Sequence, residues 1–169
     1  MKNKYEKNNF IALAVPDIRG DVKKSLFKII DDNWVSSAGK EINIFEESIA
    51  KIAQSKYALA TITGSAALHL ALKTMDIGPG DKVLVPDLTF AATINSVILS
   101  GAIPIIIDIN QYNWTLDIKL TEQAIKIHKP KAIIVVHTLG NPAEISELVS
   151  ICKKYNLIIL SDEIYSELS

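Results

Sequence analysis

Residues 82–107 read KVLVPDLTFAATINSVILSGAIPIII, and they hold two short apolar runs with a helical stretch between them. The runs KVLVP and IPIII are apolar at successive positions, which is typical of strands covered on both faces. The stretch AATINSVILS ends at Gly101, and glycine commonly follows the last turn of a helix. Strand, helix and strand in this order predict a parallel crossover unit.

The same alternation continues on both sides of this unit. The apolar runs are YALATIT (57–63), KVLVP (82–86), IPIIIDI (103–109), KAIIVVHT (131–138) and LIILSD (157–162). The helical stretches are SAALHLALKTM (65–75), AATINSVILS (91–100), LTEQAIKIH (120–128) and EISELVSICKKYN (144–156). We therefore predict an α/β fold of three layers, a mostly parallel sheet with helices on both faces.

Two amphipathic helices are expected before this pattern. Apolar residues recur at helical spacing in DVKKSLFKIIDDNW (21–34) and again in the second half of VSSAGKEINIFEESIAKIAQ (35–54). A loop of small residues separates them. We expect residues 1–56 to form an N-terminal helical segment and loop, and residues 57–169 to form part of an α/β domain.

Composition and charge exclude several classes of function. The chain has 169 residues, 49% of them hydrophobic, and its 18 basic and 19 acidic residues give a net charge of −1. This balance argues against a nucleic-acid groove or an anionic membrane surface as partner. Cys152 is the single cysteine and is compatible with a reducing compartment. No run approaches the ~20 apolar residues of a membrane span, so we expect a soluble, cytoplasmic protein.

Polar and aromatic residues follow the predicted strands. Because parallel strands point the same way, the residues after them gather at one edge of the sheet, where ligands of such folds bind. These residues are Thr63, Gly64 and Ser65, then Asp87 to Phe90, Asp108, His137, and Asp162 to Tyr165. A turn with free amides, an aromatic ring, carboxylates and a phenol together predict a cofactor pocket.

Each of these residues has a structural explanation as well as a functional one. Gly64 and Ser65 open a helix whose free amides favour a single phosphate, yet Ser65 also fits a helix cap. Phe90 fits a stacking ring or a core aromatic. Asp162 fits a partner for a protonated ring nitrogen, an N-cap or a surface acid. Tyr165 fits a donor to a phenolate oxygen or a packing residue.

His137 ends a buried strand, and a structural histidine is the simpler interpretation. His69 and His128 fall in helical stretches, and neither they nor Cys152 form a metal-ligand spacing with His137. We expect no metal site.

Three stretches in order resemble the N-terminal part of the pyridoxal-phosphate-dependent sugar aminotransferases of the DegT/DnrJ type. They are NWVSSAGKEINIFEESIA (33–50), YALATITGSAALHLALKTMDIGPGDKVLVPDLTFAATINSVILSGAIPIIIDI (57–109) and VVHTLGNPAEISELVSICKKYNLIIL (135–160). The resemblance implies the incomplete large domain of a transferase fold like that of aspartate aminotransferase, and pyridoxal 5'-phosphate as cofactor. It implies that Gly64 and Ser65 bind the cofactor phosphate, that Phe90 stacks on the pyridine ring, and that Asp162 pairs with the ring nitrogen.

The resemblance also implies partners. A full-length relative would act as a homodimer with shared active sites, moving an amino group from glutamate to a keto group of a nucleotide-linked sugar. Trp34, Ser36 and Ser37 would lie near the substrate.

The chain departs from the family pattern at three places. Ser65 stands where the family usually has threonine, which keeps the hydroxyl. After Asp162 the family usually reads D-A-A-Q, but this chain reads D-E-I-Y, as in amino-acid aminotransferases whose tyrosine reaches the ring oxygen of the cofactor. Tyr165 takes that position. The lysine that forms the Schiff base in the family lies beyond Ser169, so no residue here matches it, and we expect this chain alone to be inactive.

Three functions remain open on these grounds. The first is the cofactor-binding part of a sugar aminotransferase. The second is a non-catalytic binding, dimerising or regulatory relative. The third is an amino-acid aminotransferase, which the D-E-I-Y ending allows.

Overall fold

A computed structural model describes residue 18 and residues 20–165 of the chain. Its centre is a four-stranded sheet in the order β2-β1-β3-β4. The strands are β1 (Lys82–Pro86), β2 (Ile103–Ile107), β3 (Ala132–Val136) and β4 (Ile158–Asp162). Every neighbouring pair is parallel, which confirms the crossover pattern predicted from the sequence.

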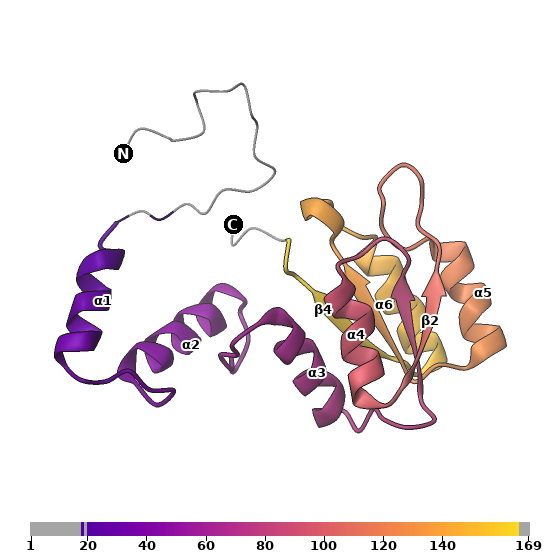
Figure 1. The fold of residues 1–169 in the computed structure, drawn as a ribbon. Helices are drawn as coiled ribbons and strands as arrows, with labels where there is room; N and C mark the ends of the chain where they lie inside the picture. Colours follow the sequence, from indigo (N-terminus) through magenta and orange to yellow (C-terminus); the bar gives the residue numbers. More distant parts are fainter. Residues whose placement is uncertain (1–17, 19, 166–169) are drawn as a thin grey trace, which may run out of the picture.

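Helices cover both faces of the sheet (Figure 1). They are α3 (Gly64–Thr74), α4 (Ala91–Ser100), α5 (Ile118–His128) and α6 (Ile145–Tyr155), and a 3-10 turn, η1 (Thr138–Gly140), follows β3. The first pair, α3 and α4, packs on one face, and α5 and α6 pack on the other. The three-layer prediction is therefore confirmed.

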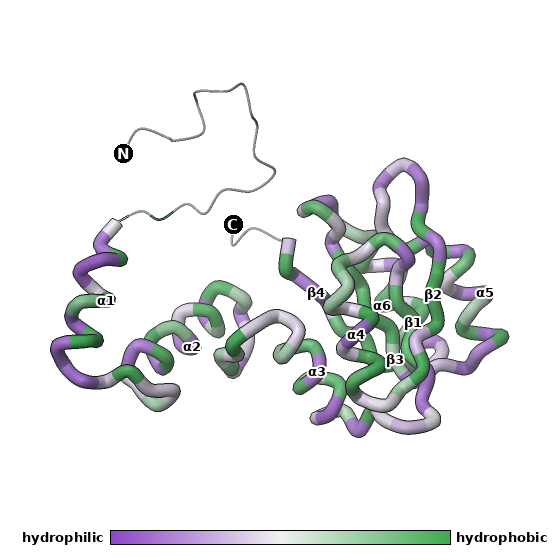
Figure 2. The backbone as a smooth tube through the Cα atoms, in the orientation of Figure 1, coloured by the Kyte–Doolittle hydropathy of each residue, from purple (hydrophilic) through white to green (hydrophobic). Residues whose placement is uncertain are grey.

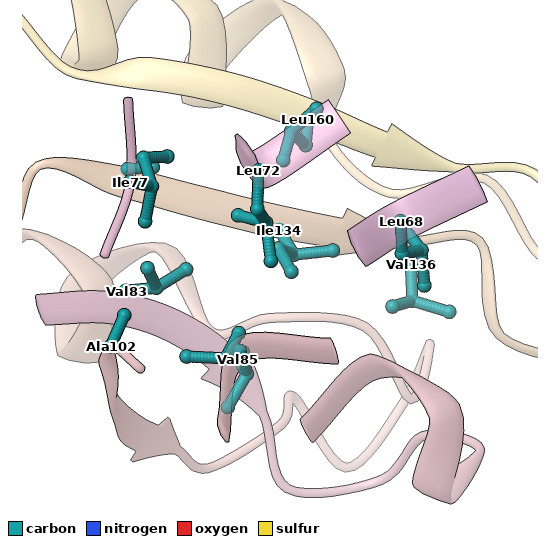
Figure 3. Close-up of a cluster of buried hydrophobic side chains, with 11 residues drawn as sticks. Leu68, Leu72, Ile77, Val83, Val85, Ala102, Ile134, Val136 and Leu160 are labelled. Atoms are coloured by element: carbon teal, nitrogen blue, oxygen red, sulfur yellow. The ribbon is translucent and has the colours of Figure 1, made fainter. Parts of the chain in front are cut away.

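Alternation along the strands divides the core into two clusters. Val85 and Ile134 point toward α3 and α4, where Figure 3 shows them with Leu72 and Leu160. The strand residues that alternate with these two point to the other face and pack with α5 and α6. That second cluster contains Leu84, Ile107, Ile133, Val135, Leu148 and Cys152. All five residues of β3 are buried, as expected of a central strand whose burial contributes about 1.5–3 kcal/mol per large side chain.

The first two helices lie apart from this core. α1 (Val22–Asp31) and α2 (Lys40–Ile52) contain no buried residue. Figure 1 shows them as an arm that leads away from the sheet, and Figure 2 shows green apolar positions along both. Both helices were predicted from their spacing. Their apolar faces are exposed, with Phe27 at 65% and Phe45 at 54%. The division of the chain at residue 56 stays a prediction.

The prediction of a strand at residues 57–63 is wrong for this structure. No strand forms there, and Leu59 and Ile62 are 69% and 94% exposed. The amide of Ala60 instead donates to Oε1 of Glu46 at 2.8 Å. A strand needs an edge to pair with as well as apolar residues. Among the described residues, nothing pairs with the outer edge of β4 or with this segment.

Within the described ranges, none of the helices combines the length and the apolar character that a bilayer crossing requires.

Candidate active site at the carboxyl edge of the sheet

The carboxyl ends of all four strands meet at one edge of the sheet. In the register of β3 with the edge strand β4, Val136 stands beside Asp162. The loop after β1 leads into α4 at Phe90, and the loop after β3 begins with His137. The predicted gathering of polar and aromatic residues at this edge follows directly from the parallel topology.

The amino end of α3 offers unpaired donors. Thr63 is the N-cap, and its hydroxyl oxygen accepts the Ala66 amide at 3.1 Å. The helix cap is therefore Thr63 and not Ser65. Within the described part of the chain, the amides of Gly64 and Ser65 and the Ser65 hydroxyl have no hydrogen-bond partner. Free amides at the positive end of a helix suit an anion.

The turn after β4 packs against this helix end. A Cβ added to Gly64 would lie 3.2 Å from Cδ1 of Ile164. Such a contact is tighter than usual, so a side chain at position 64 would push on the turn. The amino end of α3 and the segment that carries Asp162 and Tyr165 are therefore neighbours, although they lie far apart in sequence.

Asp162 is a buried carboxylate held by neutral donors. Its side chain belongs to a residue that is 7% exposed. Oδ2 accepts the hydroxyl of Thr93 at 3.0 Å, and Oδ1 accepts the amide of Ile164 at 3.3 Å. In the described residues it forms no ion pair. It is neither an N-cap nor a surface acid, so both structural alternatives for Asp162 are excluded.

Thr93 and Thr89 belong to this arrangement; Thr89 lies in the predicted stretch Asp87 to Phe90 without a role assigned to it there, and Thr93 was missed in the sequence. The hydroxyl of Thr93 is committed to Asp162, so the hydroxyl of Thr89, at 2.8 Å, donates to Thr93. Thr89 lies just before α4, and Thr93 lies in the first turn of that helix. The signal that could have found them is two hydroxyls at i and i+4 beside a strand end.

Phe90 is not a core aromatic. It is the N-cap residue of α4, and it is 58% exposed. The Thr93 amide donates to its carbonyl oxygen at 3.0 Å, so Phe90 lies one helical turn before the residue that holds Asp162. An exposed aromatic ring can stack on a planar ligand.

Tyr165 and Thr138 lie at the ends of neighbouring segments at this edge. Tyr165 is half-buried and packs against the cluster beneath α3 and α4. Its carbonyl oxygen lies 3.3 Å from a Cβ built on Gly140. Thr138 is 4% exposed, and its hydroxyl is buried without a partner in the described residues. An orphaned hydroxyl at a strand end is a second donor available to a ligand.

The loop between α1 and α2 does not reach the sheet edge. Trp34 is 50% exposed and lines a hollow of this arm together with Ile29 and Lys40. Ser36 and Ser37 are exposed in the same loop. Figure 1 shows the loop on the far side of α2 from the strands. Their place near a substrate stays a prediction.

His137 contacts residues of two neighbouring segments. Its Nδ1 accepts the Ala143 amide at 3.0 Å. Its Nε2 lies 3.2 Å from Oε1 of Glu163 and 3.3 Å from the hydroxyl of Ser161. These contacts were not anticipated from the sequence, because they depend on the pairing of β3 with β4.

The cysteine and the carboxylates of the described residues do not assemble a metal centre, since no group of three or more His, Cys, Asp or Glu there could hold an ion. Cys152 is 2% exposed, and burial raises the pKa of its thiol. A thiol in such a place is a packing group.

This chain is similar to known proteins over most of its length. The model of the DegT/DnrJ/EryC1/StrS aminotransferase family matches residues 16–164. GDP-perosamine synthase of Escherichia coli O157:H7 is 35% identical over 153 residues, which cover 90% of this chain and 42% of that protein. The chain thus spans about 40% of the length of the curated relatives it matches.

Solved structures of related enzymes share the fold. An aminotransferase from Psychrobacter cryohalolentis has a TM-score of 0.85 and 31% identity, with 90% of this chain and 38% of that chain covered. GDP-4-keto-6-deoxymannose-3-dehydratase, solved with a trapped PLP-glutamate geminal diamine, has a TM-score of 0.80 and 25% identity, with 89% and 40% covered. With a family model that spans nearly all of the described residues, this chain belongs to the DegT/DnrJ/EryC1/StrS aminotransferase family.

Proposed function

We propose that this chain is the cofactor-binding N-terminal part of a pyridoxal-phosphate-dependent aminotransferase that acts on a keto group of a nucleotide-linked sugar. One observation carries the proposal. Asp162 is buried at the carboxyl edge of a parallel sheet, and within the described residues it has hydrogen-bond donors but no cation. A buried carboxylate without a counter-ion is costly unless a cationic group is supplied. A protonated pyridine nitrogen is such a group.

The residues of this edge fit the other parts of the cofactor. The free amides of Gly64 and Ser65, with the Ser65 hydroxyl, suit a single phosphate. The exposed ring of Phe90 suits the face of a pyridine. Tyr165 offers a phenol to the ring oxygen. The buried, unpaired hydroxyl of Thr138 provides a further donor at the same edge.

When bound, pyridoxal phosphate supplies an electron sink for the pair of electrons left when a substrate carbon loses its proton. In this chain Asp162 would keep the ring nitrogen protonated, because a carboxylate favours the charged form of its neighbour. Thr93 fixes the direction of that carboxylate. Gly64 and Ser65 would anchor the phosphate, and Phe90 would cover one face of the ring and keep water from it.

A nucleotide-linked keto sugar as substrate is supported by the relatives. Two of them are named for GDP-linked sugars, a GDP-perosamine synthase and a GDP-4-keto-6-deoxymannose-3-dehydratase. The second was solved with a glutamate adduct of the cofactor, which supports glutamate as the amino donor. The surface of this chain that would contact the sugar includes Trp34, Ser36 and Ser37 in our proposal.

A homodimer accounts for the position of these three residues. The arm formed by α1 and α2 carries them away from the sheet edge of the same chain (Figure 1). Its apolar residues, including Leu26, Phe27 and Phe45, are more than half exposed. We propose that the arm packs on a second subunit and brings Trp34 to the active site of that subunit. We also propose that the protein acts in the cytoplasm.

An amino-acid aminotransferase is the second candidate, because Tyr165 follows Asp162 in the D-E-I-Y ending. The two candidates differ in the acceptor. A full-length parent should aminate GDP-linked keto sugars and fail with common keto acids. Turnover with keto acids alone would replace the first proposal by the second.

The 169-residue chain alone should not link covalently to the cofactor. Every lysine precedes Asp162, and none matches the cofactor-linking lysine of the family. We expect borohydride reduction in the presence of pyridoxal phosphate to label no single lysine. Stoichiometric labelling of one lysine together with transamination would contradict this. If the chain binds neither pyridoxamine phosphate nor a sugar nucleotide, the non-catalytic alternative is favoured.

A further inference from the structure

The ring of His137 is held from two sides in one tautomer. Its Nδ1 accepts the Ala143 amide at 3.0 Å. A ring nitrogen that accepts an N–H carries no proton of its own, so the proton of the neutral ring is on Nε2. This N–H faces Oε1 of Glu163 at 3.2 Å and the hydroxyl of Ser161 at 3.3 Å.

Ser161 completes a closed set of hydrogen bonds. Its hydroxyl donates to Oε1 of Glu163, while His137 donates to the same pair of oxygens. His137 is well shielded, with 12% of its side chain exposed. The three side chains therefore connect the end of β3 to the two residues on either side of Asp162.

Serine, histidine and glutamate here do not form a nucleophilic triad. In a triad the serine and the acid bind opposite nitrogens of the imidazole, so that the acid orients the ring while the other nitrogen takes the proton of the serine. Here Ser161 and Glu163 both face Nε2, and Nδ1 is occupied by the Ala143 amide. The arrangement is built to hold a position.

The end of β4 is held from both faces of the sheet. Side chains alternate along a strand, and Leu160 packs with the cluster under α3 and α4, whereas Ile159 packs with the cluster under α5 and α6. Asp162 accordingly bonds Thr93 of α4. Ser161 points to the opposite face.

We infer that His137 and Glu163 form a latch that fixes the turn of residues 162–165 and so positions Asp162 and Tyr165 for the cofactor. The inference rests on the proposed function. Glu163 stands where the family that this chain resembles usually has alanine. The latch therefore depends on a side chain that the usual D-A-A-Q sequence lacks. Because Ile164 packs against the phosphate end of α3 at Gly64, movement of the turn would also disturb the anion site.

The first experiment measures the turn without any cofactor. Amide hydrogen exchange of Ile164, whose N–H bonds Asp162, is followed by NMR in the unaltered chain, E163A, E163Q and E147A. Removing the latch should speed exchange about 5-fold or more in E163A. E163Q keeps an acceptor oxygen and should restore slow exchange. Glu147 is exposed on α6 and lines the hollow beside His137, so E147A is the matched control.

The imidazole signals give a signature that a general loss of stability would not reproduce. The chain has three histidines, so the His137 ring can be assigned from the spectrum of H137Q. We expect its proton on Nε2, detectable as a slowly exchanging signal in the unaltered chain and in E147A, and lost to fast exchange in E163A. A proton on Nδ1 would contradict the latch.

The second experiment tests positioning with pyridoxamine phosphate, an amine that needs no lysine linkage. Calorimetric titration should show about 5-fold weaker binding for E163A and for H137A. The variant that carries both changes should bind pyridoxamine phosphate no more weakly than either single variant, since each change alone already breaks the contact between His137 and Glu163. Additive losses, or full affinity in E163A despite faster exchange of Ile164, would overturn the positioning role.

The two proposals fail in different ways. If the unaltered chain does not bind pyridoxamine phosphate, the proposed function is contradicted, and the exchange of Ile164 still decides whether the latch holds the turn. If the unaltered chain binds and E163A exchanges as slowly as E147A, the latch is wrong and the proposed function stands. Circular dichroism of E163A checks its fold, which should persist because the Glu163 side chain is 54% exposed.

Discussion

The hydroxyl of Thr93 donates to Oδ2 of Asp162 at 3.0 Å, across 69 positions of sequence. This contact joins the first turn of α4 to the end of β4. Because a hydroxyl with one proton can serve only one acceptor at a time, Thr93 is oriented by Asp162 and in turn accepts from Thr89. The carboxylate is thereby aimed by its neighbours before any ligand arrives.

Replacement of Thr93 by valine keeps the shape and removes the hydroxyl. It leaves a buried carboxylate oxygen without its donor, which should lower the free energy of unfolding by about 1–3 kcal/mol. Urea unfolding measures this loss. S100A is the control. Ser100 is buried in the same helix, but its hydroxyl contacts only the backbone of Val97 and Ala102, which are close in sequence. A T93V change no larger than that of S100A would show that the contact contributes little.

Thr63 and Ser65 should have separable effects, although they are two positions apart. T63A removes the cap of α3 and should cost about 1 kcal/mol of stability. S65A removes a hydroxyl without an internal partner, so stability should stay within about 0.5 kcal/mol. Binding of pyridoxamine phosphate to S65A should fall roughly tenfold.

Urea unfolding and calorimetry of T63A and S65A give both quantities. Full affinity in S65A would remove Ser65 from the anion site. The same stability loss in both variants would contradict the assignment of Thr63 as the cap.

Phe90 should matter for binding more than for folding. Its side chain is 58% exposed, so F90A should change stability by less than about 0.5 kcal/mol. Loss of stacking should weaken pyridoxamine phosphate binding about 3- to 10-fold. L99A truncates an exposed residue near the other end of α4 and should leave affinity unchanged. Equal affinity of F90A and L99A would exclude a stacking role.

Glu122 should contribute stability that depends on pH. Hydrogen bonds from Lys154 and then Tyr155 lower the pKa of its carboxyl from 4.5 to about 2. A group whose pKa is depressed in the folded state stabilises that state above its unfolded pKa and loses the contribution as the pH falls through the folded value. The contribution should therefore be present above pH 4.5 and lost toward pH 2.

Chemical unfolding at a series of pH values between 6 and about 2 checks this expectation in the unaltered chain and in E122Q. The curve of E122Q should be flatter across that window. E147Q, a change at an exposed glutamate of α6, should follow the unaltered chain. Parallel curves for all three would show that the surface contacts of Glu122 with Lys154 and Tyr155 are screened by solvent.

The four strands and the six α-helices of the described residues could be predicted from the sequence because their cause is local. Continuous apolar runs such as Ile133 to Val135 fit only positions covered on both faces, and Gly101 with its positive φ of 88° ends α4 as expected. The apolar run at residues 57–63 shows the limit of this reasoning. It has strand composition, yet Ile62 is 94% exposed, because a partner edge is a property of the assembled sheet.

The candidate site likewise has some features that follow from the sequence and others that only the tertiary structure determines. The sequence by itself determined which residues stand after the strands, among them Phe90 and Asp162, since chain order and parallel topology place them at one edge. Only the tertiary structure decided that Thr63 is the cap and that Thr93 holds Asp162. It alone joined His137 to Glu163. Such contacts depend on strand register and side-chain direction, which come from packing between distant segments and leave no periodic trace in the sequence.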